Sequence, residues 1–132
     1  MAKANSSARS PFKPVSFSSG RGHGLFVSID VQKRLMLSSD VRKKLGISDL
    51  MSPWIAVFYD KETHRIAIQK EELVKVAPVE AKTKVDKRGY FNAKSVLEAA
   101  AIDDSRLPLR YYYDGDVSIE GERFLSFKLR AN

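Results

Sequence analysis

Residues 28–47 read SIDVQKRLMLSSDVRKKLGI, a stretch that predicts two short strands and a helix. Apolar and polar residues alternate at its start, a turn follows at residues 31–33, and a second apolar strand comes next. A helix is then predicted from an N-capping hydroxyl, an apolar face with four-residue spacing, and a glycine suited to a left-handed helix end. The residues concerned are Ser38 or Ser39, Val41 with Leu45, and Gly46.

Residues 83–102, TKVDKRGYFNAKSVLEAAAI, form a second and more divergent copy of this stretch. Asp86 corresponds to Asp30, and Gly89 takes the turn position. The second copy is one residue shorter, and two basic residues change: Arg34 becomes Tyr90 and Arg42 becomes Glu98. An internal repeat of this size predicts two similar units in tandem. We place them at residues 25–76 and 77–132, with a boundary near Pro78 and a preceding arm at residues 1–24.

Further strands are predicted after each copy. Residues 54–60, WIAVFYD, are too apolar for a strand with one solvent-exposed face, so we expect burial on both faces, with Trp54 in the core. A polar turn that includes His64 leads to a returning strand whose Ile66 and Ile68 face the core. In the second unit, Asp114-Gly115 is typical of a hairpin turn and residues 120–122 of another. Residues 123–130 alternate as a last strand that closes the sheet or covers its edge.

Length and composition limit the class of protein. The chain has 132 residues, 43% of them hydrophobic, and no cysteine. A unit of roughly fifty residues alone would bury little surface, so the two units are expected to share one core or to pair with another chain. The sequence has no apolar run long enough for a membrane span and no signal-peptide pattern at its N-terminus, so we expect a cytoplasmic protein.

The formal net charge is +7, and its distribution is uneven. Residues 1–24 carry no acidic residue and are rich in Ser, Gly and Pro, so we expect this arm to be disordered in isolation. It either adds contacts to DNA phosphates or a minor groove, or is an unstructured tail of mild positive charge. Its basic residues are Lys3, Arg9, Lys13 and Arg21.

The first copy resembles the N-terminal signature of the AbrB-like swapped-hairpin DNA-binding superfamily (AbrB, MazE, SpoVT and MraZ). That signature has Asp, two variable residues, Gly-Arg, an aliphatic strand, Pro, and a helix that carries Arg and closes on Leu-Gly-Ile. The matching positions here are Asp30, Lys33-Arg34, Leu35-Met36-Leu37, Ser38, Val41-Arg42 and Leu45-Gly46-Ile47. Lys33 replaces the usual Gly and Ser38 the usual Pro, so the turn is less sharply specified and a cap starts the helix.

The resemblance implies a mainly β protein with short helices: a swapped-hairpin β-barrel in which tandem units form an intrachain pseudo-dimer or a domain-swapped oligomer. It also implies a double-stranded DNA-binding transcriptional regulator, nucleoid-associated when bound and a homo-oligomer, as a dimer or larger. If the turn and helix of each copy converge on one surface, positive charge focused there attracts phosphates; the alternative is a solvated helix face. The candidate DNA-binding residues are Lys33, Arg34, Arg42, Lys43, Lys44, Lys84, Lys87, Arg88 and Lys94.

Other function classes have weaker support in the sequence. No nucleophile elbow, phosphate-binding glycine loop or metal-ligand spacing is present, so we expect a non-enzyme without cofactor or metal. One alternative is a protein-interaction module, antitoxin-like or host-directed, on the same scaffold. Another is a general single-stranded nucleic-acid binder that uses the basic face as its groove. The second copy can also be purely structural, completing the barrel without touching DNA.

Overall fold

The computed structural model describes residues 11–12, 24–48 and 50–130. This part of the chain forms an eight-stranded antiparallel sheet with the strand order β5-β3-β4-β8-β7-β1-β2-β6. In chain order the strands are β1 (Phe26–Ile29), β2 (Arg34–Leu37), β3 (Trp54–Asp60), β4 (Arg65–Lys70), β5 (Lys82–Lys84), β6 (Tyr90–Asn92), β7 (Leu109–Ile119) and β8 (Glu122–Leu129). The helices are α1 (Ser39–Leu45) and α2 (Lys94–Ala100), with short 3-10 turns η1 (Glu71–Leu73), η2 (Val79–Ala81) and η3 (Asp104–Arg106).

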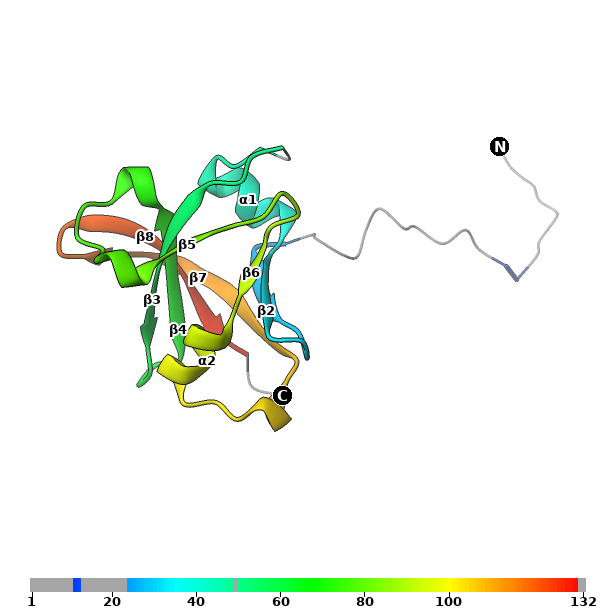
Figure 1. The fold of residues 1–132 in the computed structure, drawn as a ribbon. Coiled ribbons are helices and arrows are strands. Elements are labelled where there is room, and N and C mark those ends of the chain that lie inside the picture. The colour runs from blue at the N-terminus through cyan, green and yellow to red at the C-terminus, as the bar shows by residue number, and fades with distance from the viewer. Residues whose placement is uncertain (1–10, 13–23, 49, 131–132) are drawn as a thin grey trace, which may run out of the picture.

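The sheet curves until its two edge strands, β5 and β6, lie near each other (Figure 1). These strands follow one another in the chain, and at their turn the Asp86 amide donates to the Tyr90 carbonyl at 2.9 Å. The result is a nearly closed barrel of mainly antiparallel β structure with short helices. None of the helices in the described residues is long and apolar enough to cross a membrane.

Two apolar clusters hold the barrel together. The larger one fills its interior and draws on both halves of the chain, including Ile29, Leu35, Val85 and Phe91. The smaller lies on the outer face of β3, β4 and β8, where Ala56 and Phe124 pack beneath Val74 and Ala77. Because residues 71–81 cover this outer face, β3 is buried on both sides through Ile55 and Ala56, as the sequence predicted.

The first helix forms as its sequence predicted. Ser38 is its N-cap, and the Ser38 hydroxyl accepts from the Val41 amide at 3.2 Å. Val41 and Leu45 are buried, while Gly46 ends the helix with a left-handed φ of 79°. The turn at residues 31–33, the buried Ile66 and Ile68, and the turn position of His64 are likewise confirmed.

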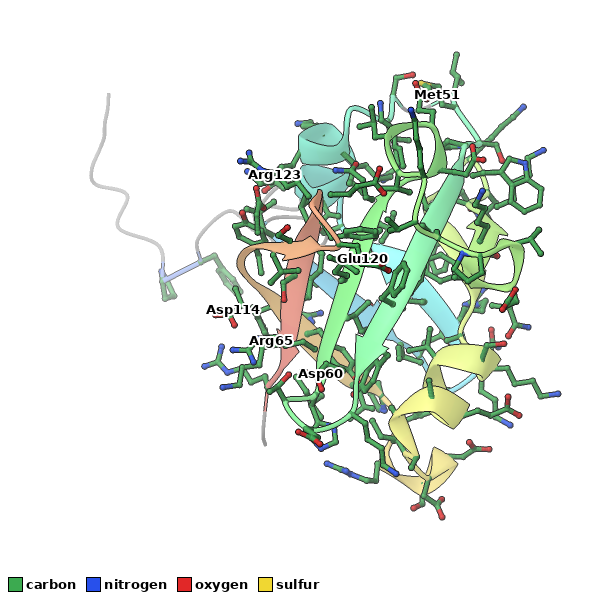
Figure 2. The ribbon with its side chains drawn as sticks, turned by 90° about the vertical axis from the view of Figure 1, so that its left-hand side faces the viewer. Met51, Asp60, Arg65, Asp114, Glu120 and Arg123 are labelled. Carbon is green, nitrogen blue, oxygen red and sulfur yellow. The ribbon has the colours of Figure 1, made fainter. Side chains whose placement is uncertain are left out.

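Three strand predictions were wrong. Trp54 is 53% exposed, because residues 71–81 cover Ala56 but leave the start of β3 open. Asp114-Gly115 lies inside β7 at a register shift, where Gly115 has a φ of 96° and Asp114 pairs with Arg65 Nη2 at 2.6 Å (Figure 2). The β7–β8 turn is at Glu120 and Gly121, so the second predicted turn, at residues 120–122, is confirmed. Of the two roles predicted for the last strand, covering an edge was wrong, because β8 is central and pairs with both β4 and β7.

Candidate nucleic-acid interface

The two copies form turns with the same hydrogen bonds. In the first, one carboxylate oxygen of Asp30 accepts from the Gln32 and Arg34 amides, each at 2.9 Å. In the second, Asp86 accepts from the Arg88 and Tyr90 amides at 2.8 and 2.9 Å. An Asp at the start of a turn favours this geometry, because its short side chain bonds the amides that follow it.

The strands after these turns pair with each other. Leu35 is opposite Phe91 in the β2–β6 ladder, and the Leu37 amide donates to the Gly89 carbonyl at 2.8 Å. The corresponding bond from the Ala93 amide to the Lys33 carbonyl is also 2.8 Å. The first turn therefore lies beside α2 and the second beside α1, with the helices at opposite ends of the strand pair (Figure 1).

The β2–β6 pair points its alternate side chains into the barrel and away from it. Leu35 and Leu37 are buried, whereas the residues between and before them are only half-buried. We call the outward side chains of the pair the ribbon face; its members are Arg34, Met36, Tyr90 and Asn92.

Tyr90 lies at the centre of a cationic cluster on the ribbon face. The guanidinium carbon of Arg34 is 4.9 Å from the centroid of the Tyr90 ring, and that of Arg88 is 5.2 Å from it. Both distances fall within the range of cation–π attraction, so the ring holds two guanidinium groups near the surface. In the repeat, Tyr90 stands where the first copy has Arg34, and the sequence signal for its role is that an aromatic residue follows Arg88 by two positions.

Arg34 is also tied to the turn that precedes it. Its Nε atom donates to Asp30 Oδ2 at 2.9 Å. Partial burial raises the pKa of Asp30, but the hydrogen bonds from the Arg34 amide and guanidinium more than offset this and hold the pKa below its ordinary value. Asp30 therefore stays ionised at neutral pH and orients Arg34 across the ribbon face.

The other predicted residues divide between the two ends of the ribbon. Lys33 pairs with Asp104 at 2.7 Å, and both line a surface hollow of about 260 Å³ together with Lys94. At the other end, the Arg42 side chain packs on Gly89, next to Lys87 and Arg88 in the second turn. Arg42 is thus brought to the second copy's turn, and Lys33 to the second copy's helix.

The predicted convergence of Lys33 and Arg34 with the α1 residues of their own copy does not occur. The first turn lies beside α2, at the end of the strand pair away from α1. Successive residues of a helix point in different directions, and Lys44 Nζ lies 5.2 Å from the centroid of the Tyr113 ring. Lys43 is exposed on α1, and Lys84 is exposed at the end of β5. Within the described residues no ion pair is seen for Lys43, Lys84, Lys87 or Lys94.

The alignment of Arg42 with Glu98 was also wrong. The helices correspond cap to cap: N-cap Ser38 with N-cap Ala93, and left-handed Gly46 with left-handed Ala101. The residue missing from the second copy is therefore lost at the junction of strand and helix, and Arg42 corresponds to the buried Leu97. The basic residues of the arm, Lys3, Arg9, Lys13 and Arg21, lie outside the described residues.

Comparison with known proteins found no matching family model, no matching curated protein and no matching solved structure.

Proposed function

We propose that this protein binds double-stranded DNA through the ribbon face and its two turns, as a transcriptional regulator of the AbrB-like, swapped-hairpin type. The observation that carries the proposal is the β2–β6 pair itself, a two-stranded ribbon with Arg34 and Arg88 gathered around Tyr90. The major groove of B-DNA, about 12 Å wide, admits a two-stranded β-ribbon, and such ribbons are an established means of reading it.

Charge at both ends of the ribbon supports the same proposal. Lys33 and Lys94 lie at one end, and Lys87 with Arg42 at the other. The nearby carboxylates Asp30, Asp86, Glu98 and Asp104 are fewer than the cations, and Asp30 and Asp86 are held in turn hydrogen bonds. A ribbon with an excess of cations is complementary in charge to the negative phosphates of the two DNA strands that border a groove.

The pairing of the two halves supports the proposed family type. β1 pairs with β7 of the other half, and β5 of the second half pairs with β3 of the first. Leu35 and Phe91, which the repeat places at equivalent positions, face each other directly. Two hairpins exchanged within a single chain would pair in this reciprocal way, which supports the proposal of an intrachain pseudo-dimer that forms the ribbon without a second copy.

A salt titration of duplex binding tests the proposal. The full chain is titrated with a labelled random-sequence duplex and a genomic fragment pool, beside an Arg34→Gln, Arg88→Gln double variant. The matched control is Lys61→Gln, Lys75→Gln, which removes equal charge from exposed positions beyond the ribbon face. Loss of two phosphate contacts makes the negative slope of log K against log salt shallower by roughly two.

The two outcomes separate clearly. Duplex binding that the ribbon variant weakens and the control variant leaves intact would support the proposal. Absence of duplex binding at low salt, or equal effects of both variants, would overturn it and favour the protein-interaction module.

A further inference from the structure

Trp54, the one tryptophan of the chain, lies half-exposed at the start of β3. It pairs directly with Lys84 of the edge strand β5, so the two side chains stand side by side on the same face of the sheet. The Pro53 carbonyl accepts from the Val85 amide at 3.0 Å, which fixes this junction to the strand that leads into the second turn. The indole is therefore held at a defined place beside a cation.

The ladder register identifies the equivalent position in the second half as Arg110. Ser28, two residues before Asp30, pairs with Arg110, just as Lys84, two residues before Asp86, pairs with Trp54. Both outward positions are exposed, but only the first half places an aromatic ring there, and Trp54 is 53% exposed. An exposed tryptophan is thus a property of this position in the first half, and large exposed apolar side chains mark interaction sites when they gather.

Further apolar and cationic side chains accompany Trp54. In the preceding loop Leu50 is 83% and Met51 40% exposed, and Figure 2 shows Met51 at the end of the molecule beyond the start of β3. The turn that follows Lys84 and Val85 carries Lys87 and Arg88. The sequence also places Asp49 in this loop, outside the described residues.

Two carboxylates near this site have contacts of their own. Asp86 accepts the amides of its own turn, and Glu71 pairs with Lys82 at 3.1 Å. The surface around Trp54 therefore offers a flat aromatic face, apolar side chains and positive charge together. Single-stranded nucleic acid has the complementary chemistry, because bases stack on aromatic rings while phosphates are drawn to nearby cations.

We propose that Trp54 and Lys84 form a stacking site for an unpaired base of a nucleic acid. An acidic peptide would match the charge but not the shape, because these side chains protrude instead of lining a groove; the nearby pocket of about 430 Å³ is bordered by other residues, such as Phe91 and Ser95. The site goes beyond the proposed duplex-binding function and does not depend on it, because neither Trp54 nor Lys84 belongs to the ribbon face.

The emission of Trp54 gives a direct test, since no other tryptophan contributes. The full chain is titrated with oligothymidine of roughly 12 nucleotides, with a fully paired duplex, and with poly-glutamate. We expect quenching by the oligothymidine at concentrations where the duplex and poly-glutamate quench weakly. No quenching by oligothymidine, or equal quenching by poly-glutamate, would overturn the site; the latter result would identify an acidic-peptide surface.

Variants locate the contact independently of fluorescence. Anisotropy of labelled oligothymidine is expected to show roughly tenfold weaker binding for Trp54→Ala, with partial retention in Trp54→Phe. Lys84→Gln should make oligothymidine binding less dependent on salt, and Lys61→Gln is the control for the lost charge. Val79→Ala changes another strongly exposed apolar position and should bind as the parent protein does. Thermal unfolding confirms that each variant is folded.

Two results decide the interpretation. Unchanged affinity of Trp54→Ala for oligothymidine would refute the stacking site. The Arg34→Gln, Arg88→Gln variant should still be quenched by oligothymidine, so failure of duplex binding and failure of the stacking site are separate results.

Discussion

Residues 30–47 and residues 86–102 build nearly the same backbone from different side chains. Lys33 and Gly89 occupy equivalent turn positions with φ values of 61° and 86°, and Gly46 and Ala101 end the two helices with φ values of 79° and 55°. A left-handed conformation is easy for glycine and strained for other residues. Each copy thus places one glycine where the other carries a side chain, and the shared hydrogen bonds hold the strained residue in place.

The two turns also differ in what surrounds them. Lys33 of the first turn is neutralised by Asp104, whereas the second turn carries Lys87 and Arg88 and receives Arg42. The repeat therefore preserves the hydrogen bonds that form the turn but not the charge displayed on it. A divergent copy can thus keep its structural role while the charge on its turn changes.

The largest expected effect tests whether the halves unfold together. Leu35 and Phe91 are buried partners across the halves, so Leu35→Ala and Phe91→Ala should lower the free energy of unfolding by about 2–5 and 3–5 kcal/mol respectively. Each variant should shift one shared transition in urea. Met36→Ala, on the outward side of the same strand, is the control and should cost clearly less. Two separate transitions, with only one displaced, would show that the halves are independent.

The second effect concerns Gly89. A Cβ there would lie 3.0 Å from Arg42 Cδ and 3.1 Å from the Leu37 carbonyl, and φ is left-handed. Gly89→Ala should therefore lose about 2 kcal/mol of unfolding free energy. At the equivalent Lys33, substitution by Gly should change it by less than about 1 kcal/mol, because relief of strain opposes loss of the exposed ion pair. Equal destabilisation by both changes would contradict the comparison.

The helix ends allow a reciprocal exchange of smaller size. Ala101→Gly should stabilise the protein by up to about 1 kcal/mol, and Gly46→Ala should destabilise it by a similar amount. At Gly46 a Cβ would meet only the flexible end of Lys70, so strain in φ dominates. Thermal unfolding of both variants checks this, and effects of the same sign would show that the two helix ends are not equivalent.

The smallest effect is electrostatic. The pKa of Asp30 is below its ordinary value, so its ionised form adds stability that is fully present above about pH 4 and is lost as pH falls through the pKa in the folded state. Arg34→Gln removes one cause of the lowering and should raise that pKa. An NMR titration of the Asp30 carboxyl measures this pKa in the parent protein and in the Arg34→Gln variant. An ordinary pKa in the parent protein would mean that Asp30 does not hold Arg34.

Local features could be predicted because their causes lie within a few residues. The capping role of Ser38, the apolar face of Val41 and Leu45 and the left-handed Gly46 all depend on neighbours in the same helix. The candidate site was predicted less completely. The basic residues of the candidate site stay a prediction, and their grouping could not be predicted, because Arg42 packs on the other copy's turn and Arg34 on the other copy's Tyr90.

By itself the sequence determined the repeat, the turns begun by Asp30 and Asp86, the two helices and the predominance of strands, because hydrogen bonds and periodicity within short segments decide these. Only the tertiary structure decided which strands pair across the halves, why β8 is central and why Trp54 is exposed. Those outcomes depend on contacts between residues far apart in the chain. A strand's own sequence does not specify which edge it meets or which segment covers it.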